Sequence, residues 1–473
     1  MRKINEYKRS LKEKVSKNNK RHFRIRKEYL DEKTIKDLDN IDLKINDLQN
    51  NNSKTDDLQI IGITGSTGKS TTAYLLHEYL KSLGYKSCLF SSCKIDAPST
   101  FIDSNSGVEL SFKSEDDLLD IIEACESYKA DFLVLEVNET NIFKGLVNDI
   151  PFKVKVLTNL IPEHNLLNYT KEEYVNIKKS FFNGSDSLHV IGYQGYNKDI
   201  FYDLVNVNKE NTLAFSSDYI SKLHKINSNE FKFLLTNLDC DLSGINFTVN
   251  NKMNFKSNNI FNYNVLNYLA VITTLNALNL FDESKFNNLI KSITIPGRSE
   301  VFKKNKENSL IIVDVHMTKA LECLKGFKDK GLIDKIKVVV GSIGSGYKYW
   351  DEVYKTSKYK ERQKVVRENA MKLLSKYADF VYLTETDSGT EDPYEICKEL
   401  ESYLDEKVPS VIITDRYEAI TKAVSELKEK EALLITGRGN RKVMCTGETS
   451  VKLFKDSDAI NNVLNKDKAL NKR

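Results

Sequence analysis

Proline and glycine are both scarce in this chain, which has 6 prolines and 20 glycines among 473 residues. Such a composition excludes collagen-like and low-complexity architectures, which depend on these two residues. Long apolar runs are missing as well. None reaches the roughly 20 residues that a membrane-spanning helix requires, and the N-terminus has no apolar core of a signal peptide. We therefore expect a cytoplasmic protein with no membrane span.

Paired cysteines are also missing, because no two of the 7 cysteines form a Cys-x-x-Cys pair. Their scattered positions exclude a zinc ribbon and a disulfide framework, so we expect reduced and mostly buried thiols. There is no strong excess of one charge either. The net charge of +4 is too small to indicate a polyanionic partner, so nucleic acid is not an expected partner.

The stretch from Leu58 to Thr72 combines an apolar run, a glycine-rich turn and the start of a helical pattern. A strand, a turn and a helix in this order form a phosphate cradle, since glycine lets backbone N–H groups approach the phosphates and the helix N-terminus adds partial positive charge. Lys69 is placed to reach the outer phosphates, and the Ser70 hydroxyl to hold Mg²⁺. The glycine spacing differs from the standard Walker pattern, because Ile63 occupies its first glycine position. The nucleotide-binding residues predicted in this turn are Gly65, Ser66, Thr67, Gly68, Lys69, Ser70 and Thr71.

Beyond the turn, strand-like runs alternate with helical stretches, which predicts a parallel sheet with helices on both faces and ligands at the carboxyl ends of its strands. The first set of predicted strands is 58–63, Ser87–Phe90, Phe132–Val137, Val154–Leu157 and His189–Tyr193, with helices at Ser70–Leu83, Asp116–Tyr128 and Asn264–Leu278. After Pro296-Gly297-Arg298 the alternation restarts, with strands at Leu310–Val315, Lys337–Gly341, Phe380–Thr384, Ser410–Thr414 and Ala432–Thr436. The expected fold class is α/β, with a P-loop parallel-sheet ATPase domain followed by a second Rossmann-like α/β domain.

Four segments follow from this pattern. Residues 1–55 are strongly basic and poor in apolar residues, so we expect a charged, solvated helical N-terminal extension. A clamp for an anionic substrate or for nucleic acid is the alternative. Residues 56–296 form the expected ATP-binding domain, residues 297–460 the second domain and residues 461–473 a basic tail.

Polar groups follow several of the predicted strands. Glu136 ends one strand, Glu163 and His164 follow the next, and Lys178 lies on a later predicted helix. These positions place each group near the edge of the sheet where the phosphate turn opens. A structural role for His164 and a surface position for Lys178 are the alternatives.

Taken together, these signals resemble the Mur ligase family, and most closely its UDP-N-acetylmuramoyl-tripeptide synthetases, the branch that adds diaminopimelate or lysine. The similarity covers about residues 56–445. Its motifs, in the family's order, are Gly62 to Thr72, Leu135-Glu136-Val137, Thr158-Asn159-Leu160 through Tyr174 to Lys178, Tyr263-Asn264-Val265-Leu266-Asn267, Gly297-Arg298-Ser299-Glu300, Val313-Asp314 through His316, Thr384 to Pro393 and Gly437 to Arg441. The last two resemble the stretches that hold the incoming amino acid in the family.

The resemblance implies an ATP-dependent ligase that joins a carboxylate to an amine through an acyl phosphate, with Mg²⁺ as its metal. The implied substrates are a small-molecule or peptidyl carboxylate and an amino acid. The implied catalytic residues are Lys69, His164 and Lys178. Lys178 would be carbamylated by CO₂, which turns an ammonium into an anionic ligand.

The resemblance also implies where the metals and the nucleotide bind. Ser70 and Glu136 would hold one Mg²⁺, and His164 and Lys178 a second. The remaining nucleotide contacts would be Asn264 and Asn267 to adenine, and Arg298 and Asp314 to phosphate and ribose. Helix capping is a second reading of Asn264.

The chain departs from the family on the substrate side. Its N-terminal region is shorter than the domain that grips the UDP-sugar in the family, and Asn138-Glu139-Thr140 replaces the family's Ser-Ser-His. The stretch 386–389 lacks the arginine that would pair with diaminopimelate, so that amino acid is not expected. Arg441 indicates an acidic added group, whereas Asp387 would attract an amine, and both readings stay open. A standard UDP-muramoyl-tripeptide or pseudomurein synthetase and a non-catalytic P-loop nucleotide-binding or regulatory protein are the alternative functions.

Overall fold

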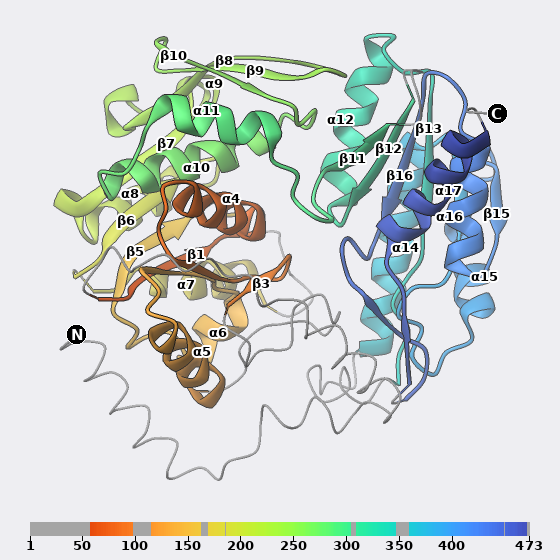
Figure 1. The fold of residues 1–473 in the computed structure, drawn as a ribbon, viewed down its shortest axis with the longest axis horizontal. Coiled ribbons are helices and arrows are strands. Elements are labelled where there is room, and N and C mark those ends of the chain that lie inside the picture. The colour runs from red at the N-terminus through yellow and green to blue at the C-terminus, as the bar shows by residue number, and fades with distance from the viewer. Residues whose placement is uncertain are drawn as a thin grey trace.

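The computed structural model describes residues 57–97, 115–161, 169–184, 186–303, 309–346, 359–448 and 450–470. These residues form two α/β units, one built on a ten-stranded sheet and one on a six-stranded sheet (Figure 1). The predicted N-terminal extension, residues 1–55, lies outside the described residues. Helices and strands are named by the labels of Figure 1.

The larger sheet has the strand order β10-β9-β8-β7-β6-β5-β1-β4-β2-β3. Its strands are β1 (Gln59–Thr64), β2 (Ser87–Phe90), β3 (Ile95–Asp96), β4 (Phe132–Glu136), β5 (Phe152–Leu157), β6 (Leu188–Gly192), β7 (Thr212–Ser217), β8 (Phe233–Asp241), β9 (Gly244–Val249) and β10 (Met253–Ser257). In this spatial order, all neighbours between β8 and β2 pair in parallel. At the two edges, β3 pairs antiparallel with β2, and β9 pairs antiparallel with both β8 and β10. The predicted parallel sheet is confirmed for β1, β2, β4, β5 and β6, and the parallel strands β7 and β8 and the antiparallel strands β3, β9 and β10 are additional to it.

Helices cover both faces of this sheet, as the alternation predicts. They are α4 (Lys69–Ser82), α5 (Glu115–Ser127), α6 (Glu139–Phe143), α7 (Lys171–Ser180), α8 (Lys198–Asn206), α9 (Asp218–Leu223), α10 (Asn264–Ala277) and α11 (Glu283–Ser292), with short 3₁₀ turns η2 (Lys209–Asn211) and η3 (Ser228–Glu230). Successive side chains of a strand point to opposite faces. Ile61 therefore packs with Leu76 of α4, and Ile60 lies in the separate cluster that holds Val175 of α7.

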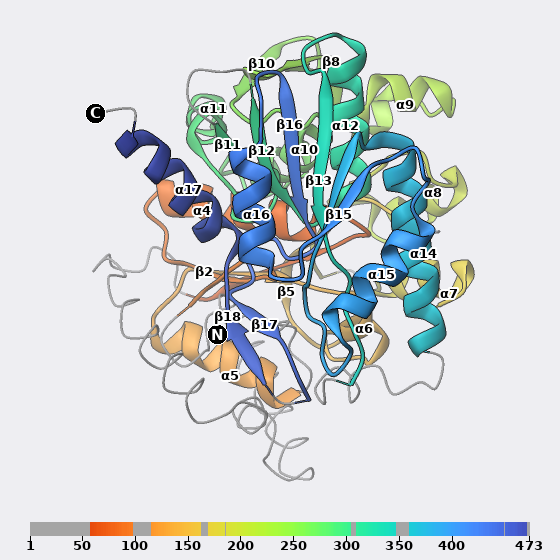
Figure 2. The same cartoon turned by 90° about the vertical axis from the view of Figure 1, so that its right-hand side faces the viewer.

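The second unit has the strand order β11-β12-β16-β13-β14-β15, parallel except for the edge pair β11 and β12 (Figure 2). Its strands are β11 (Glu300–Lys303), β12 (Leu310–Asp314), β13 (Lys335–Val340), β14 (Phe380–Leu383), β15 (Ser410–Ile412) and β16 (Glu431–Thr436), and β17 (Val443–Cys445) and β18 (Val451–Leu453) form a separate ribbon. Its helices are α12 (Met317–Asp329), α14 (Tyr359–Tyr377), α15 (Pro393–Tyr403), α16 (Arg416–Ser425) and α17 (Asp456–Leu470). Side chains of α12, α14 and α15 pack in one core and those of α16 and α17 in another.

The two units meet at a pocket lined by the turn that follows β1 and by Asp314 at the end of β12. The carboxyl ends of parallel strands from both sheets therefore face the same space, which is where ligands bind in such sheets. None of the seven cysteines is in a disulfide, and only Cys240 is partly exposed. Among the described helices, none has the length and apolarity needed to cross a membrane.

Candidate active site

Residues that follow β5 hold the glycine-rich turn in place. The Thr158 hydroxyl donates to the Thr67 carbonyl at 2.6 Å, and the Asn159 side chain both donates to that carbonyl at 2.9 Å and accepts from the Thr67 N–H at 3.0 Å. The Tyr174 hydroxyl donates to Ser66 Oγ at 2.9 Å from α7. The turn is thus fixed by side chains from two other elements before any ligand binds.

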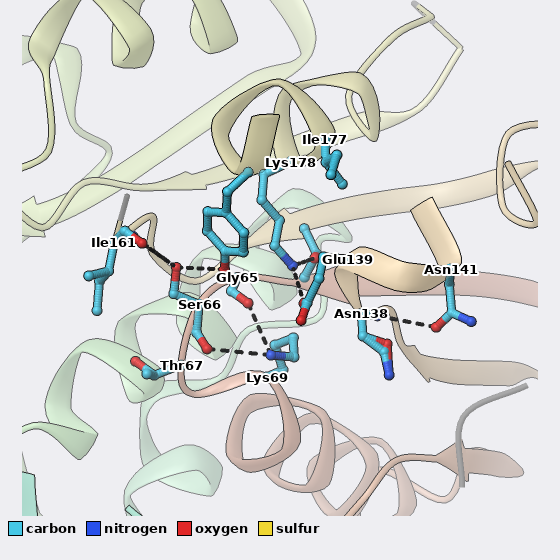
Figure 3. Close-up of polar contacts among 12 residues, drawn as sticks. Gly65, Ser66, Thr67, Lys69, Asn138, Glu139, Asn141, Ile161, Ile177 and Lys178 are labelled. Atoms are coloured by element: carbon cyan, nitrogen blue, oxygen red, sulfur yellow. Dashed lines mark hydrogen bonds and ion pairs between the residues drawn. The ribbon is translucent and has the colours of Figure 1, made fainter. Parts of the chain in front are cut away.

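Two glycines of the turn are required by close packing. Gly68 has φ +82°, and a Cβ there would lie 2.1 Å from Asn267 Oδ1. Gly65 has φ +149°, and a Cβ there would lie 2.0 Å from Thr158 Oγ1. The Lys69 ammonium folds back over the turn and donates to the Gly65 carbonyl at 3.0 Å (Figure 3). It therefore lies where a phosphate held by the turn would need a cation.

Glu136 and Ser70 lie close to each other, connected through Ser92. The parallel register pairs Glu136 of β4 with Ile63 of β1, next to the turn. Ser92 donates from its N–H to Glu136 Oε2 at 2.9 Å, and its hydroxyl lies 2.8 Å from Ser70 Oγ. Burial alone would raise the pKa of Glu136, but the Lys69 charge and hydrogen bonds from serine outweigh it and lower that pKa. An ionised carboxylate beside a hydroxyl is a donor set that suits Mg²⁺.

Lys178 enters the same region from α7, with its side chain 1% exposed. Its ammonium donates to Thr64 Oγ1 at 3.0 Å and to Glu139 Oε2 at 3.3 Å (Figure 3). Burial, and then the Lys69 charge, lower the pKa of Lys178 to about 7 despite Glu139. The structure thus brings Lys178, Lys69 and Glu136 to one end of the sheet. Glu163 and His164 lie outside the described residues.

A pocket between the two units adjoins the turn. Seven of the residues predicted to bind nucleotide line it, namely Thr67, Gly68, Thr71, Asn264, Asn267, Arg298 and Asp314. It is also lined by residues that were not among those predictions, namely Asn159, Gln194, Tyr263, Ser299, His316 and Lys319. Tyr263, Ser299 and His316 belong to the motifs quoted above, whereas no local signal distinguishes Gln194 or Lys319.

Asn264 and Asp314 connect the units across this pocket. Asn264 is the first residue of α10 and does not cap it. Its side-chain Nδ2 donates to Ser299 Oγ at 3.1 Å, and its side-chain Oδ1 accepts from Asn267 Nδ2 at 3.0 Å. The Asp314 carboxylate accepts from the Tyr263 hydroxyl at 2.7 Å and from the Ser299 N–H at 2.9 Å. These bonds order the polar groups that face the pocket.

A second polar cluster lies in the second unit around Asp387. Its carboxylate pairs with Arg438 and with Arg441, each at 3.1 Å, and accepts from the Cys445 N–H at 3.0 Å. Burial would raise the pKa of Asp387, but the two guanidinium groups lower it. The cluster therefore carries one positive charge more than negative.

Two family models match the chain, the Mur ligase middle domain over residues 63–275 and the Mur ligase, glutamate ligase domain over residues 297–439. The UDP-N-acetylmuramoyl-L-alanyl-D-glutamate–2,6-diaminopimelate ligase of Wolinella succinogenes is 24% identical over 408 residues, which are 85% of this chain and 84% of that protein. The UDP-N-acetylmuramyl-tripeptide synthetase of Bifidobacterium longum is 26% identical over 410 residues, 82% of this chain and 73% of that protein.

Solved structures of similar fold agree with these matches. One UDP-N-acetylmuramoyl-L-alanyl-D-glutamate–2,6-diaminopimelate ligase superposes with a TM-score of 0.55 at 20% identity, covering 87% of this chain and 79% of its own. MurF ligase from Thermotoga maritima, solved in complex with ADP, gives a TM-score of 0.54 at 18% identity, covering 91% and 83%. At these identities the likeness concerns the fold.

Proposed function

Because this chain belongs to the Mur ligase family, we propose that it joins a carboxylate to an amine through an acyl-phosphate intermediate, with ATP as the energy source. It is an ATP-dependent ligase that forms C–N bonds. The observation that supports its mechanism best is the meeting of Lys69, Glu136 and Lys178 at the glycine-rich turn, next to a pocket between the two units.

The reaction has two steps in this proposal. A carboxylate oxygen attacks the γ-phosphorus of ATP, and ADP leaves. The amine then attacks the carbonyl carbon of the acyl phosphate, an amide forms, and phosphate leaves with the oxygen that the carboxylate supplied. The protein mainly positions the reactants and neutralises charge.

Each residue near the turn has a task in this scheme. The N–H groups of the turn and of the start of α4 hold the phosphates, and Lys69 counters the charge that moves to the β–γ bridge. Ser70 and Glu136 would hold Mg²⁺, which screens phosphate charge when it is bound. Asn264 and Asn267 would contact the adenine from α10. From the second unit, Arg298 and Asp314 would contact the phosphate and the ribose.

Lys178 has two possible states at this site. The family resemblance implies a carbamate that would hold a second Mg²⁺ together with His164. Glu139, at 3.3 Å from the Lys178 ammonium, already supplies an anion there. We propose the carbamylated state as the active one, because burial and the Lys69 charge lower the pKa of Lys178 to about 7, which leaves part of it as the neutral amine that reacts with CO₂. A bound Mg²⁺ would offset the charges of the carbamate and of Glu139.

The substrates follow the family only in class: a carboxylate, small or peptidyl, and an amino acid. The relatives' names include a UDP-muramoyl peptide and diaminopimelate, which makes a cell-wall precursor the first carboxylate to test. Each oxygen of Asp387 already pairs with an arginine. An ammonium group on the side chain of the added amino acid would therefore have to displace a guanidinium to bind Asp387. We therefore expect an amino acid without a side-chain amine.

The test is phosphate release from ATP across a panel of amino acids, with and without UDP-muramoyl dipeptide, using wild type and Lys69→Ala. Wild type should release phosphate only when both the carboxylate substrate and an amino acid that supplies the amine are present. Lys69→Ala should lose at least about 100-fold in rate while keeping its fold, because its loss exposes charge in the transition state. Retained turnover in that variant would refute the assignment, and ATP binding without turnover on any panel member would favour the non-catalytic alternative.

A further inference from the structure

Lys319 reaches the glycine-rich turn from the other α/β unit. It lies on α12, and its ammonium donates to Thr67 Oγ1 at 3.0 Å across 252 residues of sequence. Its side chain lines the pocket between the units together with Gly68 and Asn267. The residue that it contacts directly precedes Gly68 and Lys69, so the ammonium lies at the mouth of the phosphate-binding turn.

The surroundings of this ammonium lack a direct counter-charge. Among the residues that the structure describes, no carboxylate lies within ion-pair distance of Lys319. Lys325 and Lys328 on the same helix pair with Asp329 and Asp379. Glu322 and Asp314 act on Lys319 only at longer range. A partly buried ammonium without an ion pair is therefore in place before the ligand binds.

The other contacts of Lys319 also suit a bound anion. Its ammonium lies 5.8 Å from the centre of the Tyr263 ring, close enough for a cation–π contact that adds no counter-charge. Thr67 Oγ1 takes only one of the three N–H donors. The Asp314 oxygens are occupied by Tyr263, Ser299 and the backbone of His316. A ligand that brings its own negative charge would therefore suit the two remaining N–H donors of Lys319.

We propose that Lys319 binds the phosphate chain of the nucleotide from the second unit, opposite Lys69. The inference rests on the proposed function for the identity of the anion as ATP. Two ammonium groups on separate units would then share one polyphosphate, and charge-assisted hydrogen bonds from both would draw the units together. Nucleotide binding and domain closure are coupled through this contact.

Lys319→Met tests the proposal, because methionine keeps most of the apolar stem and removes the charge. Affinities for ATP, ADP, AMP and adenosine are measured by calorimetry, and by ligand-observed NMR where they are weak. We expect ATP and ADP to bind about tenfold or more weakly than to wild type, and adenosine to bind equally well. Lys325→Met on the same helix is the matched control and should change none of these affinities.

Other outcomes would overturn the inference. Unchanged ATP affinity in Lys319→Met, with wild type binding ATP, would remove Lys319 from the phosphate site and leave the proposed function intact. An equal loss for adenosine and ATP would assign Lys319 to the nucleoside side or to folding, which a thermal melt separates. Absence of ATP binding by wild type would overturn both the inference and the proposed function.

Discussion

At the scale of single residues, the Asp387 carboxylate shows that ion pairs within the protein can occupy both oxygens of a charged side chain that the sequence alone would assign to substrate binding. The sequence leaves open whether it attracts a substrate amine. In the structure Arg438 and Arg441 occupy its two oxygens, with Arg438 fully buried. Breaking a buried ion pair by removing one partner costs about 3–5 kcal/mol. The geometry therefore favours the other reading, an acidic group on the added amino acid that is attracted to the excess positive charge.

Lys178 provides a prediction at this scale. Lys178→Ala should lose at least about 100-fold in amide formation, because an anionic group beside the turn disappears. Small carboxylic acids in solution should restore part of the rate by occupying the vacated space. The measurement is turnover with and without such acids, together with NMR of wild type in ¹³C-labelled bicarbonate, where a carbamate signal is expected.

The neighbouring lysine is the matched control for that experiment. Lys179 pairs with the exposed Asp203 on the protein surface, so Lys179→Ala should retain wild-type turnover and should not respond to carboxylic acids. If Lys178→Ala is not rescued and wild type shows no carbamate signal, the carbamate is wrong, and the Glu139 ion pair is the working state of Lys178.

At the scale of elements, most parallel strands could be predicted from the sequence, whereas β7 to β10 on one side of the first sheet and β3 on the other could not. Strand β2 has the predicted bounds Ser87–Phe90, and α4 begins one residue before the prediction. These strands are buried on both faces, so they read as continuous apolar runs. In contrast, β8 alternates half-buried and exposed residues over much of its length. It pairs antiparallel with β9, and the sequence of β8 alone does not indicate which strand it pairs with.

The first residue before α4 gives a prediction at this scale. Gly68→Ala should weaken ATP binding strongly and destabilise the protein by about 1–3 kcal/mol, because alanine would have to keep a positive φ and its Cβ would meet Asn267 Oδ1. The measurements are ATP titration and urea unfolding of the purified variant.

Gly331→Ala separates the two causes. Gly331 also has a positive φ, +69°, but a Cβ there has nothing within 4 Å. It should cost about 1 kcal/mol of stability and leave ATP affinity unchanged. Equal effects of the two substitutions on ATP binding would mean that the close approach of α10 to the turn is not what requires glycine.

At the scale of the whole molecule, the two units are joined across the pocket by side chains of both. Tyr263 donates to Asp314 at 2.7 Å, Arg298 to Ser92 at 3.4 Å, and the Asn440 amide to the Cys93 carbonyl. The Cys93 segment is next to Ser92, which contacts Glu136. We therefore expect closure of the units on nucleotide binding to act on the proposed metal ligands, as is common for enzymes that assemble their site on binding.

Asn440→Ala tests this coupling. Removing the amide leaves the Cys93 carbonyl without this donor, so we expect a smaller gain in thermal stability on adding ATP and a raised KM for ATP. For wild type, ATP at 100 times its Kd should stabilise the folded state by about 2.7 kcal/mol. Asn461→Ala, at an exposed position of α17, is the control and should behave as wild type. An identical ATP-induced shift in both variants would show that this contact does not contribute to closure.

The sequence by itself determined the glycine-rich turn, the central strands, the two-unit organisation and the carboxylate at the end of β4. Each of these depends on residues close together in the chain, where backbone geometry and alternation of burial leave a readable pattern. Only the tertiary structure decided that Ser92 connects Ser70 to Glu136, that Glu139 pairs with Lys178, and that Lys319 reaches Thr67. These contacts join segments far apart in sequence, and they exist because of which strands are neighbours and how the second unit packs against the first.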